Sequence, residues 1–219
     1  MKPHANQPLL RTGADDSTAR AAMIMIHGRN AGPANILDLV PVLKRPEFVY
    51  LAPSAASGTW YPFSFMMPRE RNEPGISSGL SVIESLVTDL LEQGFAPHQI
   101  MLLGFSQGAC LTSEFSIRFP RRYGGVMALS GGLIGEPGTT WDDVTTTALE
   151  GTPVFLGCSD VDAHIPAERV LETEAVFRRL GANVTRKLYP GMAHTVIADE
   201  IEHVQRVMDE VLQAGRAPI

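Results

Sequence analysis

Short runs rich in apolar and β-branched residues recur along the whole chain, and they restrict the fold more than any other feature. Most of these runs lack the alternation of apolar and polar residues that marks a strand with one solvent-exposed face. Continuous apolar runs are typical of strands buried on both faces of a parallel sheet. The predicted strands are Ala21–Ile26, Phe48–Ala52, Ile100–Phe105, Val126–Ser130, Val154–Gly157 and Val184–Tyr189, with Pro8–Thr12 as an additional edge strand.

Segments with helical periodicity lie between these runs. The clearest has apolar residues from Ile76 to Leu91 at helical spacing and stops at Gly94. A second runs from about Ala167 to Leu180, and a third carries the apolar positions from Ile197 to Val211 on one face. Alternating strands and helices predict an open α/β sheet. No linker divides the chain, so we expect one domain spanning residues 1–219, in which the long irregular stretch 53–75 is functional.

Composition and charge limit the kinds of molecule that this chain can be expected to bind. The net charge of -6 offers no basic surface for nucleic acid. The first 20 residues lack the apolar core of a signal peptide, and the apolar run Ala21–Ile26 is too short to span a membrane, so we expect a cytoplasmic protein without stable membrane association. The two cysteines, Cys110 and Cys158, are interpreted as small core residues, and neither a metal nor a cofactor is expected.

The strand Ile100–Phe105 leads into Gly104-Phe105-Ser106-Gln107-Gly108, and a segment able to form a helix follows. A serine on a sharp turn between strand and helix needs small neighbours, and glycines at both flanking positions provide them. The five-residue pattern alone is weak, because a simple tight turn can produce it. In this context it predicts that Ser106 is a nucleophile and that the backbone N–H of Gln107 helps to stabilise an oxyanion.

A serine nucleophile needs a base and a carboxylate, and in this type of fold they follow in the order Ser, Asp or Glu, His. After the predicted strand Val154–Gly157 come Asp160 and Asp162, of which we favour Asp162; Asp160 is interpreted as a loop-turn carboxylate. His194 follows the next strand and is the predicted base. His164 is a weaker candidate for substrate contact.

The other histidines are expected to have no catalytic role. His27 is interpreted as a structural residue hydrogen-bonded beneath the loop that follows it. His4, His98 and His203 are interpreted as surface residues.

The remaining site elements come from two loops. The strand Ala21–Ile26 runs into a loop of small residues, where the backbone N–H of Arg29 is the candidate second oxyanion donor. Within the stretch 53–75, aromatic residues and methionines are concentrated in nine residues, 60–68. They are either core anchors or the wall of an acyl pocket, and we keep both interpretations. The candidate substrate-binding residues are Trp60, Tyr61, Phe63, Phe65 and Met66, together with His164.

Taken together, these motifs resemble the phospholipase/carboxylesterase family of α/β-hydrolases, which includes acyl-protein thioesterases. The resemblance rests on His27-Gly28, Trp60-Tyr61, the segment 104–109, Leu129-Ser130-Gly131-Gly132, Asp160-Val161-Asp162 before Pro166, and Gly191-Met192-Ala193-His194. It implies an α/β-hydrolase fold with a mostly parallel sheet of about seven strands and no large cap domain. It also implies that Asp162 is the acid and that Arg29 and Gln107 are the oxyanion donors.

Two positions depart from the family pattern. Ala163 stands where the family's acid segment usually has a proline, and Asn30 stands where a glycine is usual. Arg29 and Asn30 are therefore expected to place a large polar pair at the mouth of the site.

We expect a serine carboxylesterase that acts on small to medium carboxylic esters through an acyl-enzyme, with a Ser106-Asp162-His194 triad. Acyl thioesterase or lysophospholipase-type activity is the first alternative, and a non-catalytic small-molecule receptor on the same fold is the second. The expected partner is an ester or thioester substrate, and a homodimer is compatible with the sequence.

Overall fold

In the computed structural model, which describes residues 2–15, 17–145 and 147–215, the strands form one mixed sheet. Seven strands belong to it within these residues, in the order β1-β3-β2-β4-β5-β6-β7. Every neighbouring pair is parallel except β1 and β3. The strands are β1 (Leu9–Gly13), β2 (Ala21–Ile26), β3 (Phe48–Pro53), β4 (Ile100–Phe105), β5 (Gly125–Leu129), β6 (Pro153–Ser159) and β7 (Asn183–Tyr189). This arrangement confirms the predicted α/β class and the predicted edge strand.

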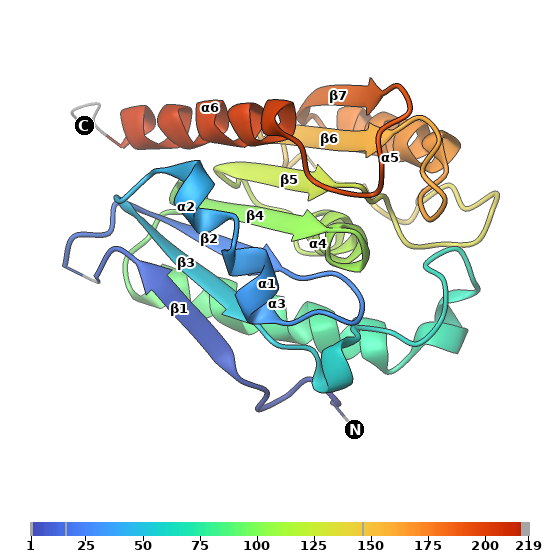
Figure 1. Ribbon diagram of the computed structural model, residues 1–219, viewed down its shortest axis with the longest axis horizontal. Coiled ribbons are helices and arrows are strands. Elements are labelled where there is room, and N and C mark those ends of the chain that lie inside the picture. Colours follow the sequence, from blue (N-terminus) through green and yellow to red (C-terminus); the bar gives the residue numbers. More distant parts are fainter. Residues whose placement is uncertain (1, 16, 146, 216–219) are drawn as a thin grey trace.

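Helices cover both faces of the sheet. On one face lie α1 (Pro33–Leu37), α2 (Val40–Leu43) and α6 (Ala198–Ala214), and on the other lie α3 (Gly75–Glu92), α4 (Gln107–Arg118) and α5 (Ala167–Arg179). Figure 1 shows the first group in front of the strands and the second group behind them. The three longest predicted helical segments are present, whereas the short helices α1 and α2 were not predicted, because so few turns carry little periodic signal.

The central strands are buried on both sides because each contributes to two cores. In β2, Ile24 and Ile26 pack with the layer that includes α3, α4 and α5. Met23 and Met25 point the opposite way and pack with α6. Since successive side chains in a strand alternate between faces, a strand covered on both faces must be apolar throughout. The uninterrupted apolar runs in the sequence therefore follow from this layering.

The N-terminal segment corrects one expectation. His4 was expected at the surface, but only 3 % of it is exposed. Its Nδ1 accepts a hydrogen bond from the N–H of Ala56, and its Nε2 lies 2.8 Å from the carbonyl oxygen of Trp60. Burial lowers the pKa of His4, although its contacts with backbone groups oppose this, so the ring is held neutral as a structural link.

Two further histidines, His98 and His203, were also expected at the surface, and their exposure differs. His98 is exposed, as expected. His203 is only partly exposed, because its ring stacks on Phe155 with centroids 4.5 Å apart.

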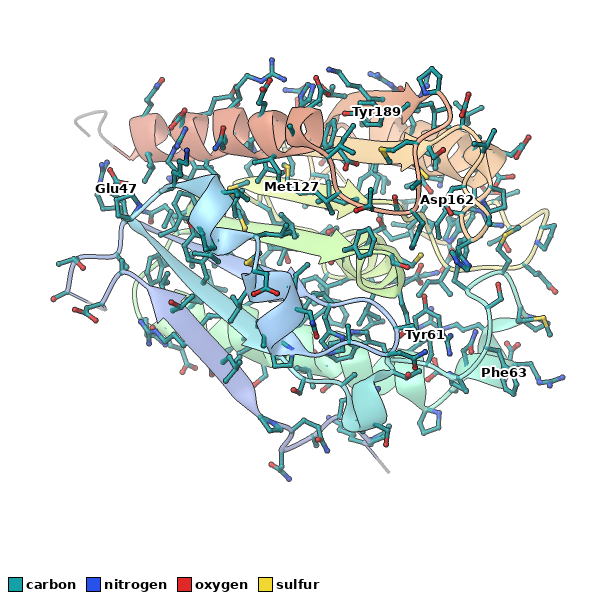
Figure 2. The ribbon with its side chains drawn as sticks, viewed as in Figure 1. Glu47, Tyr61, Phe63, Met127, Asp162 and Tyr189 are labelled. Carbon is teal, nitrogen blue, oxygen red and sulfur yellow. The ribbon has the colours of Figure 1, made fainter. Side chains whose placement is uncertain are left out.

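The carboxyl ends of the parallel strands lie at one end of the molecule. Figure 2 shows Tyr61, Phe63 and Asp162 at that end and Glu47 at the opposite end. In open α/β sheets, ligands bind at the carboxyl ends of the strands, where loops from several strands converge. The sheet therefore brings the loops after β2, β3, β4, β6 and β7 to one place.

Candidate active site

Ser106 lies on a strained turn between β4 and α4. Its backbone φ is +55° and its ψ is -120°, a combination that is costly for a residue with a side chain. The turn is tight enough that a Cβ on Gly104 would lie 2.3 Å from the carbonyl oxygen of Gly108, and one on Gly108 would lie 2.1 Å from that of Ile26. Gly104 is therefore required for β4 to approach α4 this closely, and Gly108 is required for α4 to approach the end of β2.

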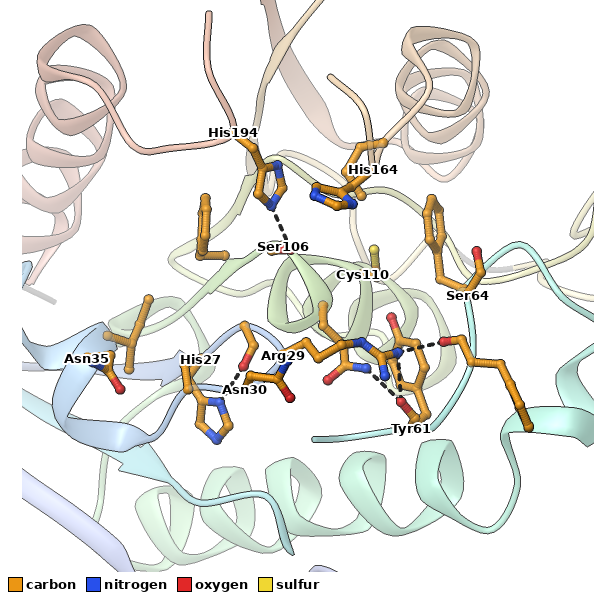
Figure 3. Close-up of a pocket in the computed structure, with 18 of the residues that line it drawn as sticks. His27, Arg29, Asn30, Asn35, Tyr61, Ser64, Ser106, Cys110, His164 and His194 are labelled. Carbon is orange, nitrogen blue, oxygen red and sulfur yellow. Dashed lines mark hydrogen bonds between the residues drawn. The ribbon is translucent and has the colours of Figure 1, made fainter. Parts of the chain in front are cut away.

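His194 and Asp162, the predicted base and acid, lie with Ser106 in one chain of hydrogen bonds. Nε2 of His194 lies 2.8 Å from Oγ of Ser106, and Nδ1 of His194 lies 2.6 Å from Oδ2 of Asp162. Figure 3 shows His194 directly above Ser106 at the centre of the pocket. The three residues are far apart in sequence and come together because the loops after β4, β6 and β7 end at the same edge of the sheet. The geometry is that of a relay in which a base contacts the nucleophile and a carboxylate orients the base.

The carboxylate of Asp162 is buried and well supported. Its Oδ1 accepts hydrogen bonds from the backbone N–H groups of His164 and Ile165, at 2.8 and 3.1 Å. Burial alone would raise the pKa of Asp162, but the hydrogen bonds from His194 and from these amides outweigh it and hold the pKa below its usual value. Asp162 is therefore held as an anion that can stabilise a protonated His194.

Asp160 lies outside this relay. Its Oδ1 accepts a hydrogen bond from the N–H of Gly191 at 2.8 Å. It therefore ties the loop after β6 to the loop that carries His194, which agrees with its interpretation as a loop carboxylate.

The two candidate oxyanion donors belong to the same pocket as Ser106: Gln107 follows it in the chain, and Arg29 lies on the loop after β2. Among the residues that the structure describes, the backbone N–H groups of Arg29 and Gln107 have no hydrogen-bond partner. Gln107 begins α4, so its N–H also belongs to the positive end of a helix dipole. Two amides without partners beside a nucleophile can bind the negative oxygen of a tetrahedral intermediate.

A cavity of about 690 Å³ opens over the serine. Four of the six candidate substrate-binding residues line it: Tyr61, Phe63, Phe65 and His164. The ring of His164 lies edge-on to that of His194, with centroids 4.9 Å apart. The cavity therefore has an aromatic wall on one side and histidines above the nucleophile.

Trp60 and Met66 do not line this cavity, which corrects their assignment as substrate-binding residues. Trp60 is fully buried, and its Nε1–H donates to the carbonyl oxygen of His27 at 2.9 Å. Its ring also contacts those of His4 and His27, with centroids 5.1 Å apart in each case. Of the two interpretations of this aromatic segment, Trp60 fits the core anchor. Met66 is half-buried and packs against the main core.

His27 has the structural role expected of it. It is buried, its Nδ1 lies 2.7 Å from the carbonyl oxygen of Gly28, and its Nε2 accepts the N–H of Ala55 at 3.1 Å. Burial lowers its pKa, so the ring stays neutral in this arrangement.

Several pocket residues were not predicted from sequence. Cys110 was interpreted only as a core residue, yet it lines the cavity as well as being buried. It follows Ser106 by four positions, one helical turn along α4, and that spacing could have identified it. Phe105, Ile165 and Asn35 also line the cavity; Phe105 packs on the ring of His194, with centroids 5.0 Å apart.

With this geometry established, comparison with known proteins places the chain in a family. The sequence profile of the Phospholipase/Carboxylesterase family matches residues 13–212. The chain belongs to the phospholipase/carboxylesterase family. Members of this family are ester- and thioester-hydrolysing α/β-hydrolases, which agrees with the resemblance drawn from the motifs.

Individual relatives agree with this placement. A phospholipase/carboxylesterase from Dyadobacter fermentans is 38% identical, with a TM-score of 0.89 over 95% of this chain and 98% of that one. The Bacillus cereus carboxylesterase shares the fold at 18% identity, with a TM-score of 0.70 over 94% and 95% of the two chains. Acyl-protein thioesterase 1 of Kluyveromyces lactis is 32% identical over 64% of this chain, and the match spans 61% of that protein's length.

The described part of the chain lacks two further features. No helix there is long and apolar enough to cross a membrane. Nor do three or more His, Cys, Asp or Glu residues gather there in a way that could hold a metal ion.

Proposed function

We propose that the protein is a serine carboxylesterase that hydrolyses small to medium carboxylic esters through an acyl-enzyme on Ser106. The observation that carries this proposal is the relay of two short contacts, 2.8 Å from Ser106 to His194 and 2.6 Å from His194 to Asp162. The relay lies in a cavity of sufficient size for a small ester.

The chemistry follows from these contacts. Oγ of Ser106 attacks the ester carbonyl carbon while Nε2 of His194 takes its proton, and the amides of Arg29 and Gln107 hold the oxyanion. When the intermediate collapses, His194 gives the proton to the departing alcohol and the acyl group remains on Ser106. Water then attacks the acyl carbon, with His194 as base, and releases the carboxylic acid and the free serine. Asp162 stabilises the charge on His194 in both halves.

The decisive variant is Ser106→Ala. We expect it to lose turnover of p-nitrophenyl acetate by a factor of about 10³ or more while keeping its thermal midpoint. A fluorophosphonate should add one label to the intact wild-type protein and none to the variant. Ser85→Ala, an exposed serine on α3, is the matched control and should behave as the wild type does. Full turnover by Ser106→Ala would refute the proposed function.

Thioester or lysophospholipid hydrolysis is the second candidate, and the relatives named acyl-protein thioesterase 1 favour it. The same relay can expel a thiolate as readily as an alkoxide. A rate series that pairs oxygen and sulfur leaving groups on one acyl chain separates the two activities. A non-catalytic receptor would give neither turnover nor labelling in any of these assays.

A further inference from the structure

One guanidinium group binds three consecutive backbone carbonyls of the aromatic wall. Nη1 of Arg29 donates to the carbonyl oxygen of Pro62 at 2.8 Å, and Nη2 donates to those of Tyr61 at 2.9 Å and Phe63 at 2.7 Å. Figure 3 shows the side chain extended toward Tyr61. The residue was expected to place its charge at the pocket mouth, but its charged group is directed onto the wall.

Gln107 holds the same segment from another direction. Its Oε1 accepts the N–H of Trp60 at 2.9 Å, and its Nε2 donates to the carbonyl oxygen of Tyr61 at 2.8 Å. The two candidate oxyanion donors therefore both use their side chains to hold backbone groups within residues 60–63. The wall and the oxyanion donors are directly connected.

Residues 60–63 are themselves anchored to buried groups. Trp60 fixes one end through its buried ring and its bond to His27, and the N–H of Phe63 donates to the buried Oδ1 of Asn72 at 2.9 Å. The loop that carries Arg29 has no regular structure until α1 begins at Pro33, and Asn30 has a φ of +57°. A loop of this kind is mobile on its own, so hydrogen bonds to a fixed segment make the loop more rigid.

We propose that the side chain of Arg29 is a positioning residue that transfers the rigidity of residues 60–63 to its own backbone amide, and so aims that amide at the oxyanion. This inference rests on the proposed function. An oxyanion donor acts through preorganised direction and distance, so a small displacement of the amide lowers the rate without weakening ground-state binding. A planar guanidinium suits this task because its N–H groups diverge in a fixed fork, which the single ammonium of lysine cannot reproduce.

The test compares Arg29→Ala and Arg29→Lys with Arg71→Ala. Arg71 is the matched control because its guanidinium lies 4.9 Å from the ring of Phe63, outside the residues that line the cavity. Among the described residues, it forms no hydrogen bond to the carbonyls of residues 61–63. With p-nitrophenyl acetate, we expect Arg29→Ala to lower kcat by about 10- to 100-fold with KM changed less than about threefold. Arg29→Lys should recover part of the loss, and Arg71→Ala should stay near the wild-type kcat.

Chemical rescue gives a readout that a merely structural role would not move. Millimolar guanidinium chloride should restore part of the kcat of Arg29→Ala, because the free ion can bind the three carbonyls where the Arg29 guanidinium lay. Sodium chloride at equal ionic strength should not restore it. A trifluoromethyl ketone that mimics the tetrahedral intermediate should lose affinity for Arg29→Ala in proportion to the loss in kcat.

Two results would overturn the inference. One is a kcat for Arg29→Ala within about twofold of the wild type, and the other is a loss confined to KM, which would mean that the guanidinium binds substrate. If Arg29→Ala fails to fold, the same readouts on Arg29→Lys decide the matter. Failure of the proposed function is distinguishable, because it requires full turnover by Ser106→Ala, whereas failure of this inference alone leaves Ser106→Ala inactive and Arg29→Ala active.

Discussion

A buried carboxyl at the start of α6 should make the stability of the protein depend on pH. Glu200 is fully buried, and its Oε2 accepts the N–H of Ile197 at 3.0 Å. Its Oε1 has no partner among the described groups and lies against Gly157, 2.2 Å from where a Cβ on that glycine would be. Burial raises the pKa of Glu200 from 4.5 to about 7; the nearby charge of Asp199 adds to this, and the hydrogen bond from Ile197 opposes it.

The raised pKa sets both the sign and the size of the effect. Because the folded protein holds this proton more tightly than the unfolded chain does, the contribution is fully stabilising below about pH 4.5 and is lost as the pH rises through about 7. Each pH unit in that interval lowers the free energy of unfolding by about 1.4 kcal/mol. Glu200 alone should therefore lower it by about 3 kcal/mol between these limits.

The substitution Glu200→Gln removes this titration and keeps an oxygen that can accept from Ile197. Measured relative to the wild type, its free energy of unfolding should be about 3 kcal/mol larger at about pH 8.5 than at about pH 5, so the variant gains relative stability as the pH rises. Urea unfolding at the two pH values, followed by tryptophan fluorescence, measures the difference. Glu202→Gln, on the exposed face of the same helix, is the control and should show no such pH dependence. A Glu200→Gln difference that is equal at both pH values would refute the reasoning.

Two further predictions concern the site. Asp162→Asn should lower kcat by about 10³- to 10⁴-fold, because an amide at this position can favour the wrong tautomer of His194; a kcat within tenfold of the wild type would show that this carboxylate is not the orienting group. Both thiols should resist DTNB at about pH 8 until the protein unfolds, because burial raises the pKa of Cys110 to about 11 and that of Cys158 to about 12, and thiolates are the reactive form. Release of thionitrobenzoate by the folded protein would contradict this.

The parts of the fold and site that could be predicted share a physical cause. A strand with helices on both faces has no exposed positions, so the apolar run Ala21–Ile26 could be identified as β2 with the same bounds. The positions of Asp162 and His194 could be predicted because parallel strands end at one edge, and each residue follows such a strand. In both cases the signal lies within a few consecutive residues.

What could not be predicted depends on contacts between distant segments. His4 lies in an N-terminal segment without a strand or helix pattern, and only its contacts with Ala56 and Trp60 identify it as a buried residue. Trp60 and Tyr61 are neighbours in sequence, yet one anchors the core and the other lines the cavity, because consecutive side chains point in different directions. The acceptors of Arg29 are backbone carbonyls, which every residue has, so no sequence pattern marks them.

Locating the acyl group during turnover tests most directly whether Ser106 is the nucleophile. Wild-type protein mixed with excess p-nitrophenyl acetate and quenched in acid during turnover should carry one acetyl group, and peptide mass spectrometry should place it on Ser106. In Ser106→Ala, no acetyl group is expected on this peptide. Continued turnover with no acetyl group on Ser106, or with the acetyl group on another residue, would contradict an acyl-enzyme on Ser106.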